Sequence, residues 1–295
     1  MGSTDPADRA AQIIAQLPRG TWQERSFAYW ADKQLHAGDR WWRPLSAAVV
    51  AAATAAAAAF QAVGFRRVVV EDLHKLTGAL QAEPRRAVVT VANHESTIDD
   101  PLIWGAMPWR LWAPESTRWT LGAQELLYKN PALNAFFALG QTIPTVRGGG
   151  VHQLAVEIAL HKLNQGRWVH VFPEARVNQG PALLRFKWGV GRLIMEAERT
   201  PVVIPMFFRG TRATMPLGQR VLVPRPRPLA GELRIRVGDP IDFSVQVRDW
   251  RAARAAIRDP AAAAQLDCRV RSAIAARLQA AVDGLRAEIE AGAAE

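Results

Sequence analysis

From residue 66 onward, short β-rich runs alternate with stretches of helical periodicity, and this alternation restricts the possible folds more than any other feature. Runs of valine, isoleucine and aromatic residues are typical of strands buried on both faces. Between them, apolar residues such as Val151, Leu154 and Ile158 recur at intervals of three and four, the spacing of one helix face. The alternation predicts an α/β domain whose sheet is flanked by helices. The β-rich runs are residues 68–70, 87–91, 168–172, 202–208 and 233–237.

Residues 45–65 form a stretch of 21 residues without a charge, preceded by Arg40 and Arg43 and followed by Arg66 and Arg67. At about 1.5 Å per residue, a helix of this length can cross a bilayer. Eleven of the 21 residues are alanine, however, and the six strongly apolar ones contribute only about −2 to −3.5 kcal/mol to insertion. We therefore expect a membrane-associated helix that lies in one leaflet. A full span and a buried helix of a soluble core are the alternatives.

Helical regions also precede and follow these segments. Residues 7–35 predict one or two peripheral helices, broken at residues 18–20 by a proline and a glycine. Near the C-terminus, an apolar stripe with helical spacing predicts a helix that packs on the domain; its members are Val270, Ile274, Leu278, Val282, Leu285 and Ile289. The expected organisation is N-terminal helices and the membrane-associated segment in 1–65, the α/β domain in 66–245 and C-terminal helices in 246–295.

The net charge of +10 predicts an anionic partner, either nucleic acid or acidic lipid headgroups. Tryptophan favours lipid, because indole rings prefer the headgroup depth of a bilayer and eight of the eleven tryptophans lie in the first 120 residues. No nucleic-acid motif stands out, so we expect an anionic membrane surface and no nucleic acid. Seven arginines are candidates for a headgroup-binding pad: Arg209, Arg212, Arg220, Arg225, Arg227, Arg234 and Arg236.

The candidate chemistry lies in the segment NHESTIDDP, residues 93–101. His94 and Asp99 are five positions apart, which is about 140° around an ideal helix, so the two side chains can meet only in a turn. The following Asp-Asp-Pro supplies one, with an aspartate as helix cap and Pro101 as the first helical residue. In such a turn Asp99 can orient the His94 ring, which leaves its other nitrogen free to take a proton from an alcohol.

Two later segments could bind a substrate. Arg147 stands beside three glycines, an arrangement that suits a phosphodiester. Glu174 follows the β-rich run that starts at Trp168, and ligands of α/β proteins bind where strands end.

Taken in order, these segments resemble four sequence blocks of the glycerolipid acyltransferase superfamily: the His-x4-Asp turn, the Gly-x3-Pro-x2-Arg loop, the Phe-Pro-Glu strand end and a later apolar strand that contains Pro205. Three stretches are similar to its tafazzin subfamily in particular: NHESTIDDPLIWG at 93–105, WVHVFPEARVN at 168–178 and LRFKWGVGRLI at 184–194. The resemblance runs from about Trp41 to Phe243 and implies a glycerolipid-acyltransferase-like mixed sheet flanked by helices.

The resemblance further implies a phospholipid–lysophospholipid transacylase that needs neither coenzyme A nor another cofactor and remodels cardiolipin. It implies a mitochondrial membrane location facing the intermembrane space. His94 and Asp99 match the catalytic pair of the family, while Arg147 and Glu174 match residues that hold the glycerophosphate part of the substrate. This chain departs from the family at Ala175, where the family has glycine. If this position needs a positive φ, the β-carbon is unfavourable.

Other functions use the same residues. An acyltransferase with acyl-CoA as donor needs the same pair. A zinc hydrolase built on His94 and Glu95 would need a second histidine where Ile98 stands, and the single Cys268 excludes a multi-cysteine metal site, so we expect no metal. Ser96 as nucleophile lacks the Gly-x-Ser-x-Gly elbow. A non-catalytic protein that binds membrane or nucleic acid is the remaining alternative.

Overall fold

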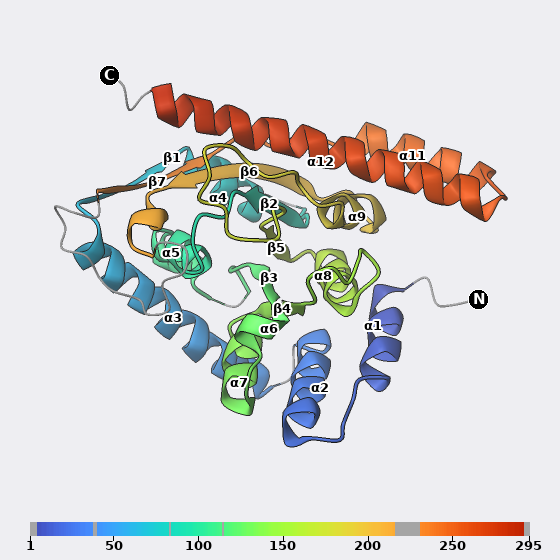
Figure 1. Ribbon diagram of the computed structural model, residues 1–295, viewed down its shortest axis with the longest axis horizontal. Coiled ribbons are helices and arrows are strands. Elements are labelled where there is room, and N and C mark those ends of the chain that lie inside the picture. Colours follow the sequence, from blue (N-terminus) through green and yellow to red (C-terminus); the bar gives the residue numbers. More distant parts are fainter. Residues whose placement is uncertain (1–4, 38–39, 83, 114, 216–230, 292–295) are drawn as a thin grey trace.

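The computed structural model describes residues 5–37, 40–82, 84–113, 115–215 and 231–291. Its centre is a seven-stranded sheet with the strand order β1-β7-β6-β2-β5-β3-β4 (Figure 1). Neighbouring strands are parallel except β6 and β7, which are antiparallel. The expected mixed α/β sheet is therefore confirmed. The strands are β1 Arg67–Glu71, β2 Val88–Ala92, β3 Trp119–Ala123, β4 Thr142–Thr145, β5 Trp168–Val171, β6 Val202–Arg209 and β7 Glu232–Val237.

All five predicted β-rich runs form strands, but two strands were not predicted. Strand β3 mixes polar, apolar and glycine residues, and β4 contains Pro144, which cannot donate a ladder hydrogen bond and is tolerated mainly at a sheet edge. β4 is an edge strand. Part of the segment that we expected to be a loop around Arg147 is therefore strand.

The sheet separates two apolar cores, one on each face, because successive strand residues point to opposite sides. On one face, Val89 and Val91 pack with α8 Leu154–Asn164, α9 Gly189–Glu196 and α12 Pro260–Ala291. On the other, Val88 and Ala92 pack with α4 Leu73–Gln81 and α5 Asp99–Gly105. The apolar stripe of α12 is buried from Ile274 onward, as expected, and α12 crosses the sheet beside α11 Ser244–Ala256 (Figure 1).

The N-terminal helices are α1 Pro6–Ala15 and α2 Trp22–Leu35, so the predicted break at residues 18–20 is confirmed. They do more than cover the surface: Ala10 and Ile14 of α1 and Leu35 of α2 belong to the same core as α8. Arg9 also forms an ion pair with the buried Glu157, with Nε and Oε2 2.8 Å apart. The division at residue 65 stays a prediction, and α1 and α2 belong structurally to the core of the domain.

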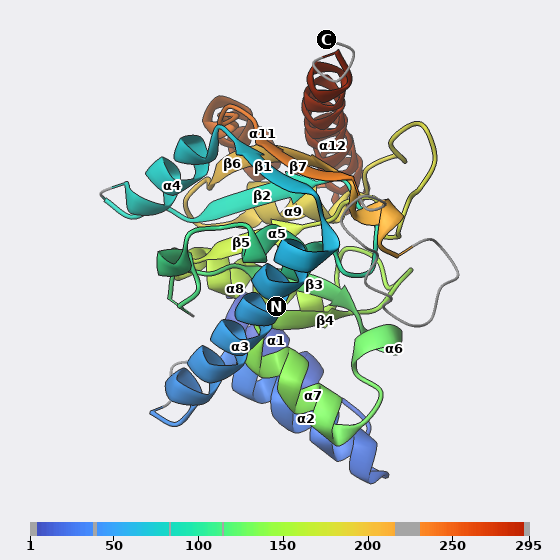
Figure 2. The same ribbon diagram turned by 90° about the vertical axis from the view of Figure 1, so that its left-hand side faces the viewer.

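Residues 45–64 of the uncharged segment lie in one helix, α3 Trp42–Gly64, which runs along the outside of the domain (Figure 2). Its uncharged polar side chains Ser46, Thr54 and Gln61 are buried, whereas Arg43 in its first turn is exposed. Ser46 Oγ donates to the Leu139 carbonyl at 2.6 Å, and Gln61 Nε2 donates to the Leu102 carbonyl. These bonds reach α7 Pro131–Leu139 at one end of α3 and α5 at the other. A β-carbon on Gly105 of α5 would lie 2.8 Å from the backbone nitrogen of Ala58, so only glycine allows this approach.

The outward side of α3 is uncharged and exposed. Only 28% of its most apolar window is buried, which differs from the core helix of a soluble protein. Alanines such as Ala52 and Ala59 alternate there with Leu45 and Val63, which are 48% and 59% exposed. The helix is therefore two-sided, with polar groups bonded to the domain and apolar groups facing outward. Within the described residues it is the only helix long and apolar enough to cross a membrane.

Candidate active site

The candidate site begins where the central strand β2 ends, at Asn93. The Asn93 side chain continues the sheet: Nδ2 donates to the Phe208 carbonyl at 2.9 Å, and Oδ1 accepts from the Phe208 amide at 3.0 Å. A side chain thus replaces the next backbone pair between β2 and β6, which frees the backbone to turn. His94 and Glu95 follow directly in this turn.

His94 and Asp99 meet in the turn as predicted. His94 Nδ1 lies 2.8 Å from Asp99 Oδ2, and the same oxygen accepts from the Ser96 amide at 2.7 Å. A carboxylate oxygen only accepts, so Nδ1 carries the proton and Nε2 keeps its lone pair. Asp99 is fully buried, whereas the His94 side chain is 20% exposed. The arrangement places a proton acceptor at the edge of the site, held in one orientation by a buried carboxylate.

The helix after the turn starts earlier than expected. Asp99 is the first residue of α5, its cap is Ile98, and no side chain caps the helix. The prediction that an aspartate caps the helix and that Pro101 is its first residue is wrong. The physical reason is that the Asp99 carboxylate turns back to His94 and Ser96, where it closes the turn instead of capping the helix.

The face of the His94 ring is covered by Phe172, with ring centroids 4.3 Å apart and planes 21° apart. Below Phe172 lies His170, in edge-to-face contact at 4.5 Å. Burial lowers the pKa of His170 to about 3, so this ring is neutral. Its Nδ1 lies 2.7 Å from Oγ1 of Thr90. Phe172 and the neutral His170 therefore restrict the His94 plane without placing a competing positive charge beside it.

Glu174 lies beside His94, but its carboxylate is already occupied. Oε1 accepts from the His94 amide at 3.0 Å, and Oε2 accepts from Asn178 Nδ2 at 2.7 Å and from the Leu184 amide at 2.8 Å. The residue is only 2% exposed. The backbone N–H of Asn178 in turn donates to the His94 carbonyl at 2.6 Å. Both backbone groups of His94 are thus bonded to the segment after β5.

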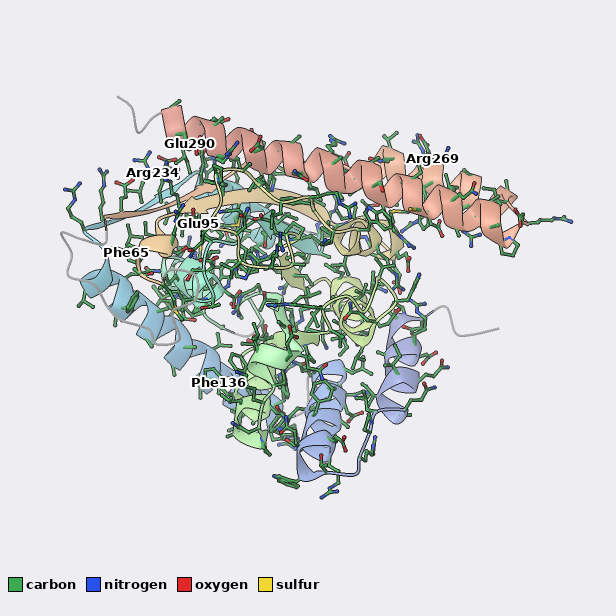
Figure 3. All side chains as sticks on the ribbon, viewed as in Figure 1. Phe65, Glu95, Phe136, Arg234, Arg269 and Glu290 are labelled. Atoms are coloured by element: carbon green, nitrogen blue, oxygen red, sulfur yellow. The ribbon has the colours of Figure 1, made fainter. Side chains whose placement is uncertain are left out.

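Glu95 binds the loop after β6. Its Oε2 accepts from the Gly210 amide at 3.1 Å and from Thr211 Oγ1 at 3.4 Å. Burial, together with the nearby Asp99, raises the pKa of Glu95. Figure 3 places Glu95 inside the molecule, near α5.

Ser96 is only 1% exposed. Within the described residues, no three His, Cys, Asp or Glu side chains group as metal ligands.

Arg147 lies apart from the other predicted residues, after β4 at the edge of the sheet. It is 47% exposed, and its Nε lies 3.1 Å from Oε1 of the equally exposed Glu125. β4 is three strands from β2, which at strand spacings of about 4.8 Å corresponds to about 14 Å. Strands β2, β5, β3 and β4 are nevertheless all parallel, so their carboxyl ends lie on the same side of the sheet. His94 and Arg147 follow two of these carboxyl ends.

The predicted arginine pad is divided. Arg209 and Arg212 are exposed beside the site. Arg234 and Arg236 lie on β7 and form ion pairs with Glu232, Glu71 and Glu288. Arg220, Arg225 and Arg227 lie outside the described residues. The contribution of the whole pad to headgroup binding stays a prediction.

Ala175 adopts a left-handed backbone conformation, with φ of 59°. This is the conformation that glycine accepts at no steric cost and that places the β-carbon of other residues too close to the backbone. The glycine that other family members have here therefore fits the observed backbone. In this chain the turn after Glu174 is closed by a strained alanine.

Comparison with known proteins gives the class first: the segment of residues 68–209 matches the acyltransferase family. It contains His94, Asp99, Arg147 and Glu174. Its relatives include tafazzins, which confirms the predicted resemblance. The chain is 39% identical over 186 residues to taffazin of Dictyostelium discoideum, and 31% identical over 271 residues to tafazzin of Drosophila melanogaster. These alignments cover 61% and 88% of this chain.

A further relative has a different name. An N-acylphosphatidylethanolamine synthase of Arabidopsis thaliana is 39% identical over 183 residues, or 60% of this chain. The alignments span slightly less than two thirds of these three relatives, 64%, 66% and 63% of their lengths. The solved structure of the 1-acyl-sn-glycerophosphate acyltransferase PlsC of Thermotoga maritima aligns with a TM-score of 0.49 at 20% identity, covering 93% of this chain and 95% of that chain.

Several residues that shape the site were not predicted. Asn93, Glu95, Phe172 and Asn178 all hold His94 or the turn around it. For Asn93 a signal existed, because a polar amide directly follows a strand that is apolar except for one threonine. For Asn178 the sequence contains no such signal, since its role depends on how the loop after β5 returns to the end of β2.

We expect His94→Ala to lower acyl transfer by at least about 10²-fold, the usual contribution of a general base. Asp99→Asn should cause a comparable loss, because the amide keeps the contact to His94 but lacks the charge that stabilises the protonated ring. Initial rates of the purified variants measure both effects. His36→Ala, at an exposed position remote in sequence, is the control. Transfer retained in His94→Ala would contradict the assignment of the base.

Ala175→Gly should raise the free energy of unfolding by up to about 1 kcal/mol, because the relief of left-handed strain exceeds the greater entropy that glycine gives the unfolded chain. Chemical denaturation measures the change. The matched control is Ala182→Gly in the same loop, where φ is not positive, and it should lower stability by up to about 1 kcal/mol. Equal destabilisation by both substitutions would show that position 175 is not strained.

Proposed function

We propose that this protein is a glycerophospholipid acyltransferase in which His94 is the general base. The observation that carries the proposal is the 2.8 Å contact between His94 Nδ1 and the buried Asp99 Oδ2. It leaves Nε2 free as a proton acceptor within a domain of the acyltransferase family. The partners that we infer are a phospholipid as acyl donor and a lysophospholipid as acyl acceptor.

The reaction needs two proton transfers, and one imidazole can perform both. His94 Nε2 takes the proton of the lysophospholipid hydroxyl as its oxygen attacks the ester carbonyl of the donor. The ring, now positively charged, is stabilised by Asp99. When the tetrahedral intermediate collapses, the bond to the donor oxygen breaks, and Nε2 returns the proton to that oxygen. The attacking group and the leaving group are both alcohols, because the donor ester leaves as a lysophospholipid, so the two half-reactions are chemically symmetric and the base is restored.

We further propose that transfer is independent of coenzyme A and that cardiolipin is among the substrates. This step rests on the sequence resemblance and on the names of the Dictyostelium and Drosophila relatives. The same resemblance supports a mitochondrial membrane, on the side of the intermembrane space. No redox or carrier group is required for ester exchange between two lipids.

Arg147 is the proposed phosphate ligand. Its guanidinium is half exposed and, within the part of the chain that the structure describes, pairs with Glu125, which is exposed as well. Such pairs are weak, about 0–1 kcal/mol, so a phosphate could displace the carboxylate and bind in the bidentate manner that arginine favours. The separation of about 14 Å between the ends of β2 and β4 requires the headgroup to extend along this edge from His94.

The exposed side of α3 is the proposed membrane contact. The inward stripe runs from Trp42 to Gly64, so the domain lies beside the helix over its whole length. A perpendicular span would carry α5 and α7 into the hydrocarbon, including the ion pair between Asp100 and Arg118. A helix that lies in one leaflet avoids this cost. α5 begins with Asp99 and packs on α3, so the site is one helix away from the bilayer.

A second candidate concerns the acceptor. The Arabidopsis relative is named a synthase of N-acylphosphatidylethanolamine, a product in which an amine carries the acyl chain. A neutral amine loses a proton on acylation just as an alcohol does, so His94 could serve either acceptor. Acyl-CoA as donor is the nearest alternative for the other substrate.

The donor is tested by supplying purified protein with phosphatidylcholine labelled in its acyl chain and with lysocardiolipin, without coenzyme A. We expect labelled cardiolipin to form, and His94→Ala to abolish it. Parallel reactions contain acyl-CoA and lysolipid, or phosphatidylethanolamine as amine acceptor. Transfer from acyl-CoA alone would exclude the transacylase, and labelled N-acyl product without labelled cardiolipin would assign the amine acceptor.

The membrane contact is tested by Ala52→Asp with Ala59→Asp, which places two charges on the outward side of α3. Because an aspartate in the hydrocarbon costs about 2.5–3.5 kcal/mol, we expect the double variant to lose most of its pelleting with liposomes that contain cardiolipin. Charge on an exposed face of α12, in Ala273→Asp with Ala280→Asp, is the control. Unchanged pelleting in the α3 variant would remove α3 from the contact.

A further inference from the structure

The loop from Pro173 to Leu184 encloses the carboxylate of Glu174. Three N–H groups donate to its two oxygens at 2.7–3.0 Å: the backbone N–H groups of His94 and Leu184 and the side-chain Nδ2 of Asn178. The side chain is 2% exposed. A group buried to this degree and bonded on both oxygens offers little surface to a substrate.

The backbone of His94 is bonded on both sides as a result. Its N–H donates to Glu174 Oε1, and its carbonyl accepts from the backbone N–H of Asn178 at 2.6 Å. Asn178 is itself fixed, since Nδ2 donates to the Ala182 carbonyl at 2.8 Å and Oδ1 accepts from the Gly180 amide at 3.0 Å. The loop and the turn therefore hold each other through the Glu174 carboxylate and the backbone N–H of Asn178, while the Asn178 side chain fixes the loop itself.

We propose that Glu174 is a positioning residue of the acyl-transfer reaction, rather than a ligand of the glycerophosphate. Its carboxylate fixes the backbone of His94, and thereby the distance of the imidazole from Asp99 and the direction of Nε2. This inference rests on the proposed function. It replaces the substrate-binding role that the family resemblance implies for this residue.

The chemistry of the three partners explains why the residue is a glutamate. All three are neutral N–H donors, so the group between them must only accept, and an ionised carboxylate does so with stronger hydrogen bonds than a neutral acceptor. Glutamine offers one oxygen. Its NH₂ would face either the His94 N–H, at the position of Oε1, or the N–H groups of both Asn178 and Leu184, at the position of Oε2, so donors are opposed in either orientation.

The test is a charge exchange between neighbours. Glu174→Gln should lower kcat by about 10- to 100-fold, the loss expected when a reacting group is misplaced by up to an ångström, with the KM for lysophospholipid within about threefold. In Glu174→Gln with Asn178→Asp, the new amide can donate to the new carboxylate, so this one bond is re-formed with its polarity reversed, while the Leu184 N–H and the Ala182 carbonyl lose their partners and the recovery is partial. We expect this double variant to recover at least about threefold in kcat over Glu174→Gln.

A second measurement does not depend on turnover. The proton between His94 Nδ1 and Asp99 gives a downfield NMR resonance, assigned by its loss in His94→Ala. We expect this resonance to shift or broaden in Glu174→Gln and to return toward its original position in the double variant. If the wild-type protein shows the resonance but transfers no acyl group to any acceptor, the proposed function fails while the positioning role is still decided by the resonance.

Other outcomes overturn the proposal. A raised KM with unchanged kcat and an unchanged resonance in Glu174→Gln would make Glu174 a substrate ligand. If kcat, KM and the resonance are all unchanged in Glu174→Gln, Glu174 has no role in the site. Should Glu174→Gln not fold, Asn178→Ala decides, because it removes one donor but leaves the carboxylate on His94. Lower kcat at unchanged KM supports positioning, and unchanged kcat contradicts it.

Discussion

The hydrogen bond between His94 and Asp99 is the interaction on which the site depends, and it exists only because the backbone between the two residues is held in a turn. Three consecutive residues hold it. Asn93 binds the end of β6, the His94 backbone is fixed by the segment after β5, and Glu95 binds the loop after β6. Strands β6, β2 and β5 are neighbours at the centre of the sheet. The turn is thus fixed to the most deeply buried part of the fold, where side chains have least freedom to move.

Buried parallel strands were predictable because their apolar runs need no partner information, and the His-Asp pair was predictable because five residues fit a turn but not a helix. The features that the sequence analysis missed or predicted wrongly depend on contacts between distant segments. β4 contains a proline that only its edge position permits. The start of α5 follows from the direction of the Asp99 carboxylate. The direction of the Glu174 side chain also depends on where Leu184 returns, which local sequence does not encode; its role in substrate binding stays a prediction.

The two-sided character of α3 shows a signal that the sequence did contain. Ser46, Thr54 and Gln61 are eight and seven residues apart, so they fall on one helix face. In an alanine-rich segment this pattern is easily taken for random interruption of an apolar stretch. In the structure these residues bond to α7, to the helix backbone and to α5. Their inward direction is what leaves the outward side free of polar groups.

α5 connects the site with α3. Its first residue, Asp99, completes the pair with His94, and its last, Gly105, contacts α3 so closely that no β-carbon fits. The turn itself is held by the sheet. The geometry of the His94–Asp99 pair is therefore set by the domain core. In the proposed function, α3 sets the depth at which that geometry meets the lipid, the imidazole needs no rearrangement when the substrate arrives, and the lipid must reach His94 along the side of α5.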